Sequence, residues 1–162
     1  MTGGSDSRVI VIPAETEDEV RRARDLVVEY AASLGFELDF QSFEEELAVF
    51  PGDYAPPRGS LLLAVREGEA VGCVAARAIG ADVCEMKRLY VQPNFRGGGI
   101  GEMLVDAVID EARRMGYKSM RLDAIRTMEA AVALYRSKGF KEIPPYRFNP
   151  VEGALYMELS LA

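Results

Sequence analysis

The sequence of 162 residues contains no histidine and only two cysteines, Cys73 and Cys84. Because histidine and cysteine are the usual ligands of structural zinc, and these two cysteines form no cluster, we expect no metal site. The two thiols are expected to be reduced and buried. Without histidine, a general base in this protein must be a carboxylate, a tyrosine, a lysine with a shifted pKa, or a water molecule.

Long apolar segments are absent as well. No run approaches the roughly 20 apolar residues of a membrane-spanning helix. Residues 1–7 are small and polar and lack the apolar region of a signal peptide. We therefore expect a flexible N-terminus at residues 1–7, no membrane partner, and a cytoplasmic protein.

Basic residues are fewer than acidic ones, 19 against 26, so the net charge is −7 at pH 7. Nucleic-acid binding requires a basic surface that faces the phosphates, so nucleic acid is not expected as a partner. The length suits one domain with a substantial core, which we place at residues 8–162. We expect this domain to act as a monomer or a homodimer.

Residues 83–115 (VCEMKRLYVQPNFRGGGIGEMLVDAVIDEARRM) are the most informative stretch. Their first part, 83–91, is rich in β-forming residues and predicts a strand, which Pro93 and Asn94 end. A glycine-rich turn follows at 96–101 (RGGGIG). Beyond it, apolar residues recur at helical spacing: Ile100, Leu104, Val108, Ala112 and Met115. The stretch is therefore predicted to form a strand, a glycine-rich turn and a helix.

The turn has the features of an anion site. The first amide groups of a helix have no partner within the helix, and the helix dipole makes that end positive. Glycines let an anion approach these amides closely, and Arg96 adds a charged donor. A P-loop would continue with Lys and Ser or Thr, but Glu102 follows Gly101. The glycine spacing of a dinucleotide site also fails. The alternative is a tight turn whose glycines only relieve strain.

The pattern Arg-x-x-Gly-x-Gly at Arg96, Gly99 and Gly101, after a strand that ends in residues 89–91 (LYV), resembles the acyl-CoA-binding motif of the GCN5-related N-acetyltransferases. Residues 134–140 (LYRSKGF) resemble the second motif of that family, and the resemblance covers residues 8–161. It implies that acetyl-CoA is the acyl donor, and it places the cofactor contacts on the strand end, the turn and one later position: Leu89, Tyr90, Val91, Arg96, Gly97, Gly98, Gly99, Ile100, Gly101 and Met128.

Other patterns predict the remaining elements. Strands are expected at 8–12, 60–66, 70–79, 118–123, 140–143 and 154–161, and helices at about 17–34, 43–50 and 127–138. Capping boxes at Thr16 with Glu19 and at Ser42 with Glu45 mark two helix starts. This order matches the resembled family and predicts an α/β (α+β) fold, with a mixed, mostly antiparallel sheet of about seven strands flanked by about four helices. In that family the central strand separates from the next one, which frees residues 89–91 to pair with pantetheine.

Two residues are candidates for catalysis. The resemblance assigns to Tyr135 the general acid that protonates the leaving thiolate, whereas the alternative is a tyrosine that only packs at a helix end. It assigns to Glu85 a carboxylate base, and the alternative there is an outward carboxylate paired with Lys87 or Arg88. A base is not strictly needed, since water can take the proton. Met128 stands where the family often has asparagine, so it either packs on the pantetheine arm or belongs to the core.

The acceptor is expected to be recognised by loops 53–58 (DYAPPR) and 145–150 (PYRFNP), which combine aromatic residues, arginine and proline. The alternative is that the prolines only shape surface loops. The candidate substrate-binding residues are Tyr54, Arg58, Arg88, Tyr146 and Arg147. For Arg88 we favour a surface ion pair over contact with an acceptor carboxylate.

These features together predict an N-acetyltransferase that moves an acetyl group from acetyl-CoA to a primary amine of a small molecule, such as an amino acid, by direct transfer in a ternary complex. Three alternatives remain open at this point. The protein is a non-catalytic acyl-CoA sensor, an interaction scaffold, or an enzyme that acetylates a protein N-terminus or lysine.

Overall fold

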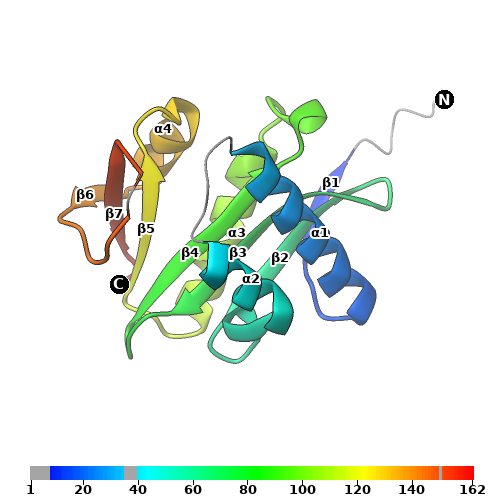
Figure 1. Cartoon of the computed structure of the whole chain (residues 1–162), viewed down its shortest axis with the longest axis horizontal. Helices are drawn as coiled ribbons and strands as arrows, with labels where there is room; N and C mark the ends of the chain where they lie inside the picture. The colour runs from blue at the N-terminus through cyan, green and yellow to red at the C-terminus, as the bar shows by residue number, and fades with distance from the viewer. Residues whose placement is uncertain (1–7, 35–39, 150) are drawn as a thin grey trace.

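The computed structural model describes residues 8–34, 40–149 and 151–162, so the predicted flexible segment 1–7 lies outside the described residues. One seven-stranded sheet, in the order β1-β2-β3-β4-β5-β7-β6, forms the body of the protein (Figure 1). Its strands are β1 Val9–Pro13, β2 Ser60–Arg66, β3 Glu69–Ala78, β4 Val83–Val91, β5 Ser119–Ile125, β6 Lys141–Ile143 and β7 Ala154–Ser160. The helices are α1 Glu17–Ser33, α2 Phe40–Val49, α3 Ile100–Arg114 and α4 Glu129–Ser137, with short 3-10 turns η2 Gly52–Tyr54 and η3 Pro93–Phe95.

The sheet is mixed, as the sequence predicted. All neighbouring strands pair antiparallel except β4 and β5, which run parallel. Two predicted helix starts were wrong. Helix α2 begins at Phe40, so Ser42 lies within its first turn and is not the N-cap, and α4 begins at Glu129 instead of Thr127. No helix in the described ranges is long and apolar enough to cross a membrane.

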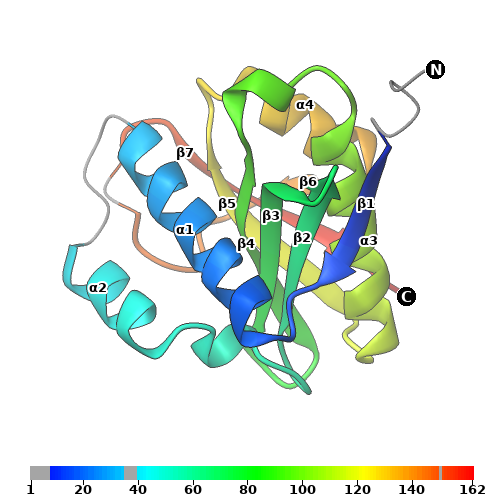
Figure 2. The ribbon, with the colours of Figure 1, turned by 90° about the vertical axis from the view of Figure 1, so that its right-hand side faces the viewer.

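The two faces of the sheet carry different helices. Helices α1 and α2 lie on one face and α3 on the other, as the side view shows (Figure 2). Helix α1 starts at the predicted capping box, in which the Thr16 side chain accepts from the Glu19 amide and the Glu19 carboxylate accepts from the Thr16 amide. It buries Ala23, Leu26 and Val27 against the sheet. The cavity of the candidate active site lies on this face of the sheet.

Helix α3 anchors the other face. Its apolar stripe packs under β2, β3 and β4, and Leu104, Val105, Val108 and Ala112 are fully buried there. Gly72 on β3 makes this packing possible, since a Cβ at that position would lie 2.9 Å from the Tyr90 carbonyl oxygen and 3.1 Å from Leu104 Cδ1. The position of the glycine-rich turn is thereby fixed relative to the end of β4.

Strands β4 and β5 pair over only three residues of each strand. The paired positions end at Glu85 and Arg121, although β4 continues to Val91 and β5 to Ile125. Beyond that point the two strands diverge, which is visible in the ribbon (Figure 1). The edge of β4 at residues 89–91 therefore has no strand partner on the β5 side, as the family resemblance implied.

The packing under α3 leads to a stability prediction. Leu104→Ala removes a fully buried side chain and leaves a cavity, which should lower the free energy of unfolding by about 2–5 kcal/mol. Met103→Ala is the matched control, because Met103 on the same helix is 37% exposed. Urea unfolding of both variants measures the difference. Equal losses would contradict the assignment of Leu104 to the core.

Candidate active site

The glycine-rich turn leaves backbone donors free at the start of α3. Gly97 and Gly99 both have φ +86°, and a Cβ at Gly97, Gly98 or Gly99 would meet nothing within 4 Å. In the described part of the chain, the amides of residues 97–102 have no hydrogen-bond acceptor. An open surface with unpaired amides at the positive end of a helix suits a phosphate group. The turn therefore fits the phosphates of a CoA-type ligand.

Arg96 has a structural contact as well. Its Nε donates to the Val91 carbonyl oxygen at 2.8 Å, and its guanidinium lies 5.7 Å from the centre of the Tyr90 ring. The side chain thus connects the turn to the end of β4. The Tyr90 side chain points to the face of the sheet that carries α1, where its hydroxyl donates to Glu29 at 2.5 Å. Tyr90 is consequently available to a ligand at the free strand edge only through its backbone.

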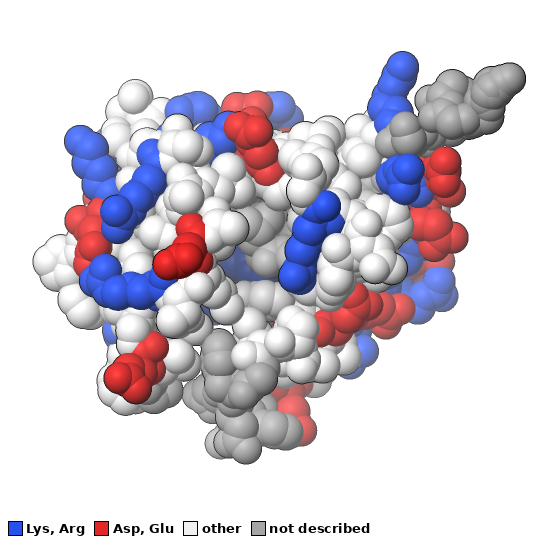
Figure 3. Space-filling view, turned by 90° about the horizontal axis from the view of Figure 1, so that it is seen from above, with Lys and Arg blue, Asp and Glu red and all other residues white. Residues whose placement is uncertain are grey.

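A cavity of about 630 Å³ lies where β4 and β5 separate. It opens on the face seen from above (Figure 3) and is closed by α1, α2, η2, α4 and the loop between β6 and β7. Six predicted site residues line it, and they come from η2, β4, α4 with its N-cap residue, and the β6–β7 loop: Tyr54, Arg88, Leu89, Met128, Tyr135 and Arg147. The structure therefore brings the predicted cofactor edge, the predicted acid and part of the predicted acceptor site together.

Tyr135 lies in α4 and faces this cavity. The residue is 8% exposed, and its ring packs edge-on against Phe140 at 5.8 Å between centroids. Burial raises the pKa of Tyr135 above its ordinary value, so the hydroxyl keeps its proton at neutral pH. Tyr135 therefore packs at the helix end and also lines the cavity with a hydroxyl that keeps its proton. A packing role at the helix end and a role as general acid are therefore compatible for this residue.

The structure does not support Glu85 as the base. Its side chain is fully buried and does not line the cavity. Oε1 accepts from Arg77 Nε at 3.1 Å, and Oε2 accepts from the Tyr146 hydroxyl at 2.6 Å and lies 3.0 Å from Arg147 Nη2. The alternative of an outward carboxylate paired with Lys87 or Arg88 is wrong, because the side chain is buried and its partners are others. Glu85 instead holds three side chains in place, Arg77 from β3 and Tyr146 with Arg147 from the β6–β7 loop.

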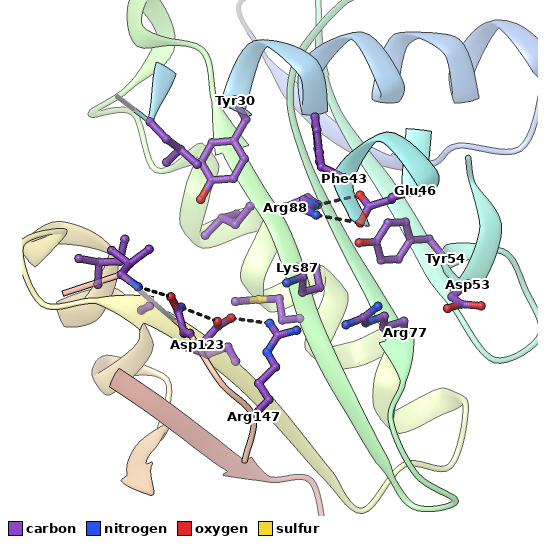
Figure 4. Close-up of a pocket in the computed structure, with 18 of the residues that line it drawn as sticks. Tyr30, Phe43, Glu46, Asp53, Tyr54, Arg77, Lys87, Arg88, Asp123 and Arg147 are labelled. Carbon is purple, nitrogen blue, oxygen red and sulfur yellow. Dashed lines mark hydrogen bonds and ion pairs between the residues drawn. The ribbon is translucent and has the colours of Figure 1, made fainter. Parts of the chain in front are cut away.

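Arg88 does not form the surface ion pair that we favoured from the sequence. Its Nε and Nη2 donate to the two oxygens of Glu46 in α2, at 3.0 and 2.8 Å, and its side chain is only 12% exposed (Figure 4). Phe43 covers the guanidinium at 5.2 Å. Because this pair is forked and largely buried, it fixes α2 over the cavity.

The other predicted acceptor residues separate into three groups. Arg58 lies away from the cavity, where it donates to the carbonyls of Gly80 and Ala81 and stacks on Tyr117, so the structure does not support a substrate contact. Tyr146 lies behind the cavity wall, bound to Glu85. Tyr54 and Arg147 line the cavity as predicted.

Sequence reasoning missed several charged residues of the cavity, among them Arg77, Lys87, Asp123 and Glu46. Asp123 accepts from Arg147 at 2.9 Å and from Asn149 at 3.0 Å. Burial opposes ionisation of Asp123, but Lys87 and Arg147 outweigh it and lower the pKa of the carboxyl group. Glu85 and Lys87 are two residues apart in β4, and this spacing was the one sequence signal that their side chains face the same side of the sheet.

The cysteines follow the prediction. Cys73 and Cys84 are free and buried, and burial raises the pKa of each thiol to about 12. A thiol of that pKa is not a nucleophile at neutral pH. Among the described residues, no group of three or more acidic, cysteine or histidine side chains could hold a metal ion.

Comparison with known proteins identifies the class. The profile of the acetyltransferase (GNAT) family matches residues 23–140. The chain is 45% identical over 139 residues to an uncharacterized N-acetyltransferase of Schizosaccharomyces pombe, covering 85% of each chain. It is 38% identical over 98 residues to N-acetylaspartate synthetase of Xenopus tropicalis, covering 60% of this chain and 36% of that one.

Solved structures share the fold. A GNAT-family acetyltransferase of Staphylococcus aureus aligns with a TM-score of 0.79 at 18% identity, covering 96% of this chain and 100% of that one. A putative acetyltransferase of Salmonella typhimurium, solved with acetyl-CoA, aligns at 0.71 and 18% identity, covering 96% and 95%. The chain belongs to the acetyltransferase (GNAT) family, and as a member it is an acyltransferase.

The contacts of Glu85 lead to a prediction about its role. Glu85→Gln removes the charge that faces two arginines, which should lower the free energy of unfolding by about 2–4 kcal/mol. Glu158→Gln is the control, because the Glu158–Arg121 pair is one-third exposed and should cost less than about 1 kcal/mol. The pH dependence of turnover should keep its shape in the Gln variant. Recovery of activity only at high pH would show that Glu85 is the base after all.

The glycine-rich turn leads to a binding prediction. Acetyl-CoA at about 100 times its Kd should raise the melting temperature by about 5–10 °C, since it binds only the folded protein. Gly99→Glu should abolish this shift by placing a carboxylate at the anion site. Gly68→Glu is the control, because Gly68 has a similar φ of +80° and equally open space but lies in the β2–β3 turn. The same shift in the Gly99→Glu variant would show that the turn does not hold the phosphates.

Proposed function

We propose that the protein transfers the acetyl group of acetyl-CoA directly to the primary amine of a small molecule that also carries a carboxylate, such as an amino acid. The main support is the juxtaposition of the free β4 edge and Tyr135 across one cavity, next to the glycine-rich start of α3. The glycine-rich turn suits the phosphates of the donor, and the polar cavity suits an acceptor. Both substrates then meet without a covalent enzyme intermediate, which the buried thiols disfavour.

The chain supplies three functions to this reaction. The backbone at residues 89–91 offers hydrogen bonds to an extended arm with amide groups, and Met128 offers an apolar contact beside it. Tyr135 holds a proton that the leaving thiolate receives as the carbon–sulfur bond breaks. The walls of the cavity exclude bulk water and orient the amine toward the donor.

The proton of the attacking amine is proposed to leave through water. The carboxylates that line the interior of the cavity are already engaged, Glu46 with Arg88 and Asp123 with Arg147 and Asn149. Asp123 is a weak base, because Lys87 and Arg147 stabilise its ionised form and lower the pKa of its carboxyl group. Solvent access at the cavity mouth gives the proton a route out.

The acceptor class is supported by the charges of the cavity and by one relative. Arg77, Lys87, Arg88 and Arg147 all line the cavity, although the chain as a whole is acidic. A carboxylate on the acceptor suits such a surface. The name of the relative from Xenopus tropicalis states that it makes N-acetylaspartate, an acetylated amino acid. We extend that class, and not its particular substrate, to this chain.

A thiol-release assay tests the proposal directly. The panel contains the common L-amino acids, their α-amides, simple alkylamines, and peptides with free N-termini or lysine side chains. Acetylation of amino acids supports the proposal. Preference for peptides would assign the protein to N-terminal or lysine acetylation, and binding of acetyl-CoA without turnover of any panel member would make it a sensor.

The placement of Tyr135 leads to a catalytic prediction. Tyr135→Phe should retain acetyl-CoA affinity and lower kcat by about 10²-fold or more, the usual range for general acid catalysis. Tyr117→Phe is the matched control, because Tyr117 is also buried but donates its hydroxyl to the Arg58 carbonyl outside the cavity. Steady-state rates and calorimetric binding separate the two effects. Wild-type turnover in the Tyr135→Phe variant would reduce Tyr135 to a packing role.

A further inference from the structure

Lys87 lies at the centre of the cavity floor, between Arg88 on one side and Asp123 with Arg147 on the other (Figure 4). The residue is partly buried. Within the part of the chain that the structure describes, its ammonium group makes no hydrogen bond and no ion pair. Partial burial of a charge without a bonded partner is unfavourable, so a ligand that supplies the partner gains affinity.

The charges around Lys87 do not cancel. Three cations and two carboxylates form the cluster: Arg77, Lys87, Arg147, Glu85 and Asp123. The adjacent Arg88 and Glu46 neutralise each other. Glu45 and Asp53 also line the cavity but are exposed at its rim, where solvent and salt screen them. The floor therefore has one positive charge in excess, which a single carboxylate would balance.

The arginines of the floor already face carboxylates. Arg88 is bound through two nitrogens to Glu46, and Arg147 contacts both Glu85 and Asp123. Arg77 donates to Glu85. An incoming carboxylate would have to displace one of these partners to use an arginine as its main contact. Lys87 requires no such displacement.

A second group in the cavity also lacks a partner. Tyr54 is 2% exposed, and its hydroxyl has no hydrogen-bond partner among the described residues. The hydroxyl points into the cavity, on the side of Arg88 and Lys87 (Figure 4). Leaving a buried hydroxyl unpaired costs about 1–3 kcal/mol. An acceptor oxygen in the cavity would accept this hydrogen bond.

We propose that Lys87 holds the carboxylate of the acceptor and that the Tyr54 hydroxyl donates to the same ligand, which makes Lys87 the residue that selects acids over amides. This inference rests on the proposed function, because it concerns the acceptor of the same cavity. The predicted substrate-binding residues include three arginines, Arg58, Arg88 and Arg147, and this inference assigns the carboxylate contact to a lysine instead. Arg88 and Arg147 then act as supports of the floor.

The environment of Lys87 gives this contact a pH dependence. Charged or titratable groups from every surrounding element face it: Tyr30, Glu46, Tyr54, Arg77, Glu85, Arg88, Asp123, Tyr135 and Arg147. Burial lowers the pKa of Lys87 to about 8, and Glu85 opposes that effect. A bound carboxylate stabilises the ammonium form and raises the pKa again. Acceptor binding should therefore be strongest below pH 8 and weaken as the pH rises through 8.

The first test compares Lys87→Met with wild type on the amino acid that the panel acetylates fastest and on its α-amide. At pH 7 the Met variant should raise KM for the acid by about 10- to 100-fold, since a charge-assisted bond is lost, and should leave KM for the amide within about twofold. Lys118→Met is the matched control, because Lys118 is 74% exposed and lies outside the cavity. It should change neither constant.

The second test uses Lys87→Arg, which keeps the charge but does not titrate in the accessible range. Both KM values for the same acid contain the titration of the acceptor amine, so this contribution cancels in the ratio of the wild-type KM to the variant KM. This ratio should rise up to about tenfold per pH unit above pH 8. Tyr54→Phe should raise KM for the acid at constant kcat and leave the pH dependence of the ratio unchanged.

Three results would overturn the inference. A panel that selects only amines without a carboxylate excludes the contact. If Lys87→Met instead lowered kcat equally for the acid and the amide, Lys87 would take part in the proton transfer. A KM ratio that stays flat from pH 7 to 9 would show that the acceptor does not bind the titrating ammonium. In the last two cases the N-acetyltransferase activity on amino acids persists, whereas failure of the proposed function would show as no acetylation of the amino acids in the panel.

Discussion

The separation of β4 from β5 is the constraint on which the rest of the site depends. Two parallel strands normally continue to pair, because unpaired backbone groups inside a protein are costly. Here pairing ends at Glu85 and Arg121. Glu85 lies at that last paired position, fully buried, and draws Arg77 from β3 and Arg147 with Tyr146 from the β6–β7 loop into the widening gap. This network fills the narrow end, and the wide end remains open as the cavity.

In the proposed reaction one strand, β4, contacts both substrates, because its backbone twists where the gap opens. Arg88 has φ +62°, and the register between β3 and β4 shifts in the adjacent segment. A regular strand would point Lys87 and Arg88 to opposite faces. The left-handed residue breaks that alternation, so both side chains line the cavity. The Leu89 side chain packs on the α3 side of the sheet, and its backbone lies at the edge of β4 that has no β5 partner. The proposed acceptor floor and the proposed donor edge thus follow each other within three residues of β4.

Local patterns in the sequence predicted most of the fold. The bounds of β2 and β4 agree with the prediction, and the Thr16 capping box starts α1 as expected, since alternation, helical spacing and caps depend on neighbours along the chain. Side-chain placement across elements was not predictable in this way. The burial of Glu85 depends on arginines 8 and 62 positions away, and Arg58 is drawn toward Tyr117 by contacts that no local pattern contains. That Lys87 and Arg88 both line the cavity was not predictable either, because the left-handed backbone at Arg88 cannot be read from residue types.

The charged floor also indicates why these residues are there. Two ion-pair groups cross the cavity, Arg88 with Glu46 and the cluster of Arg77, Glu85, Arg147 and Asp123. Buried ion pairs add little net stability, because the loss of hydration offsets the attraction, and apolar side chains of similar size would serve packing as well. An apolar floor, however, would neither bind a carboxylate nor keep the β6–β7 loop and α2 at fixed distances from β4. The polar floor is therefore better explained by recognition than by stability, and its one excess positive charge is what distinguishes it from a balanced structural network.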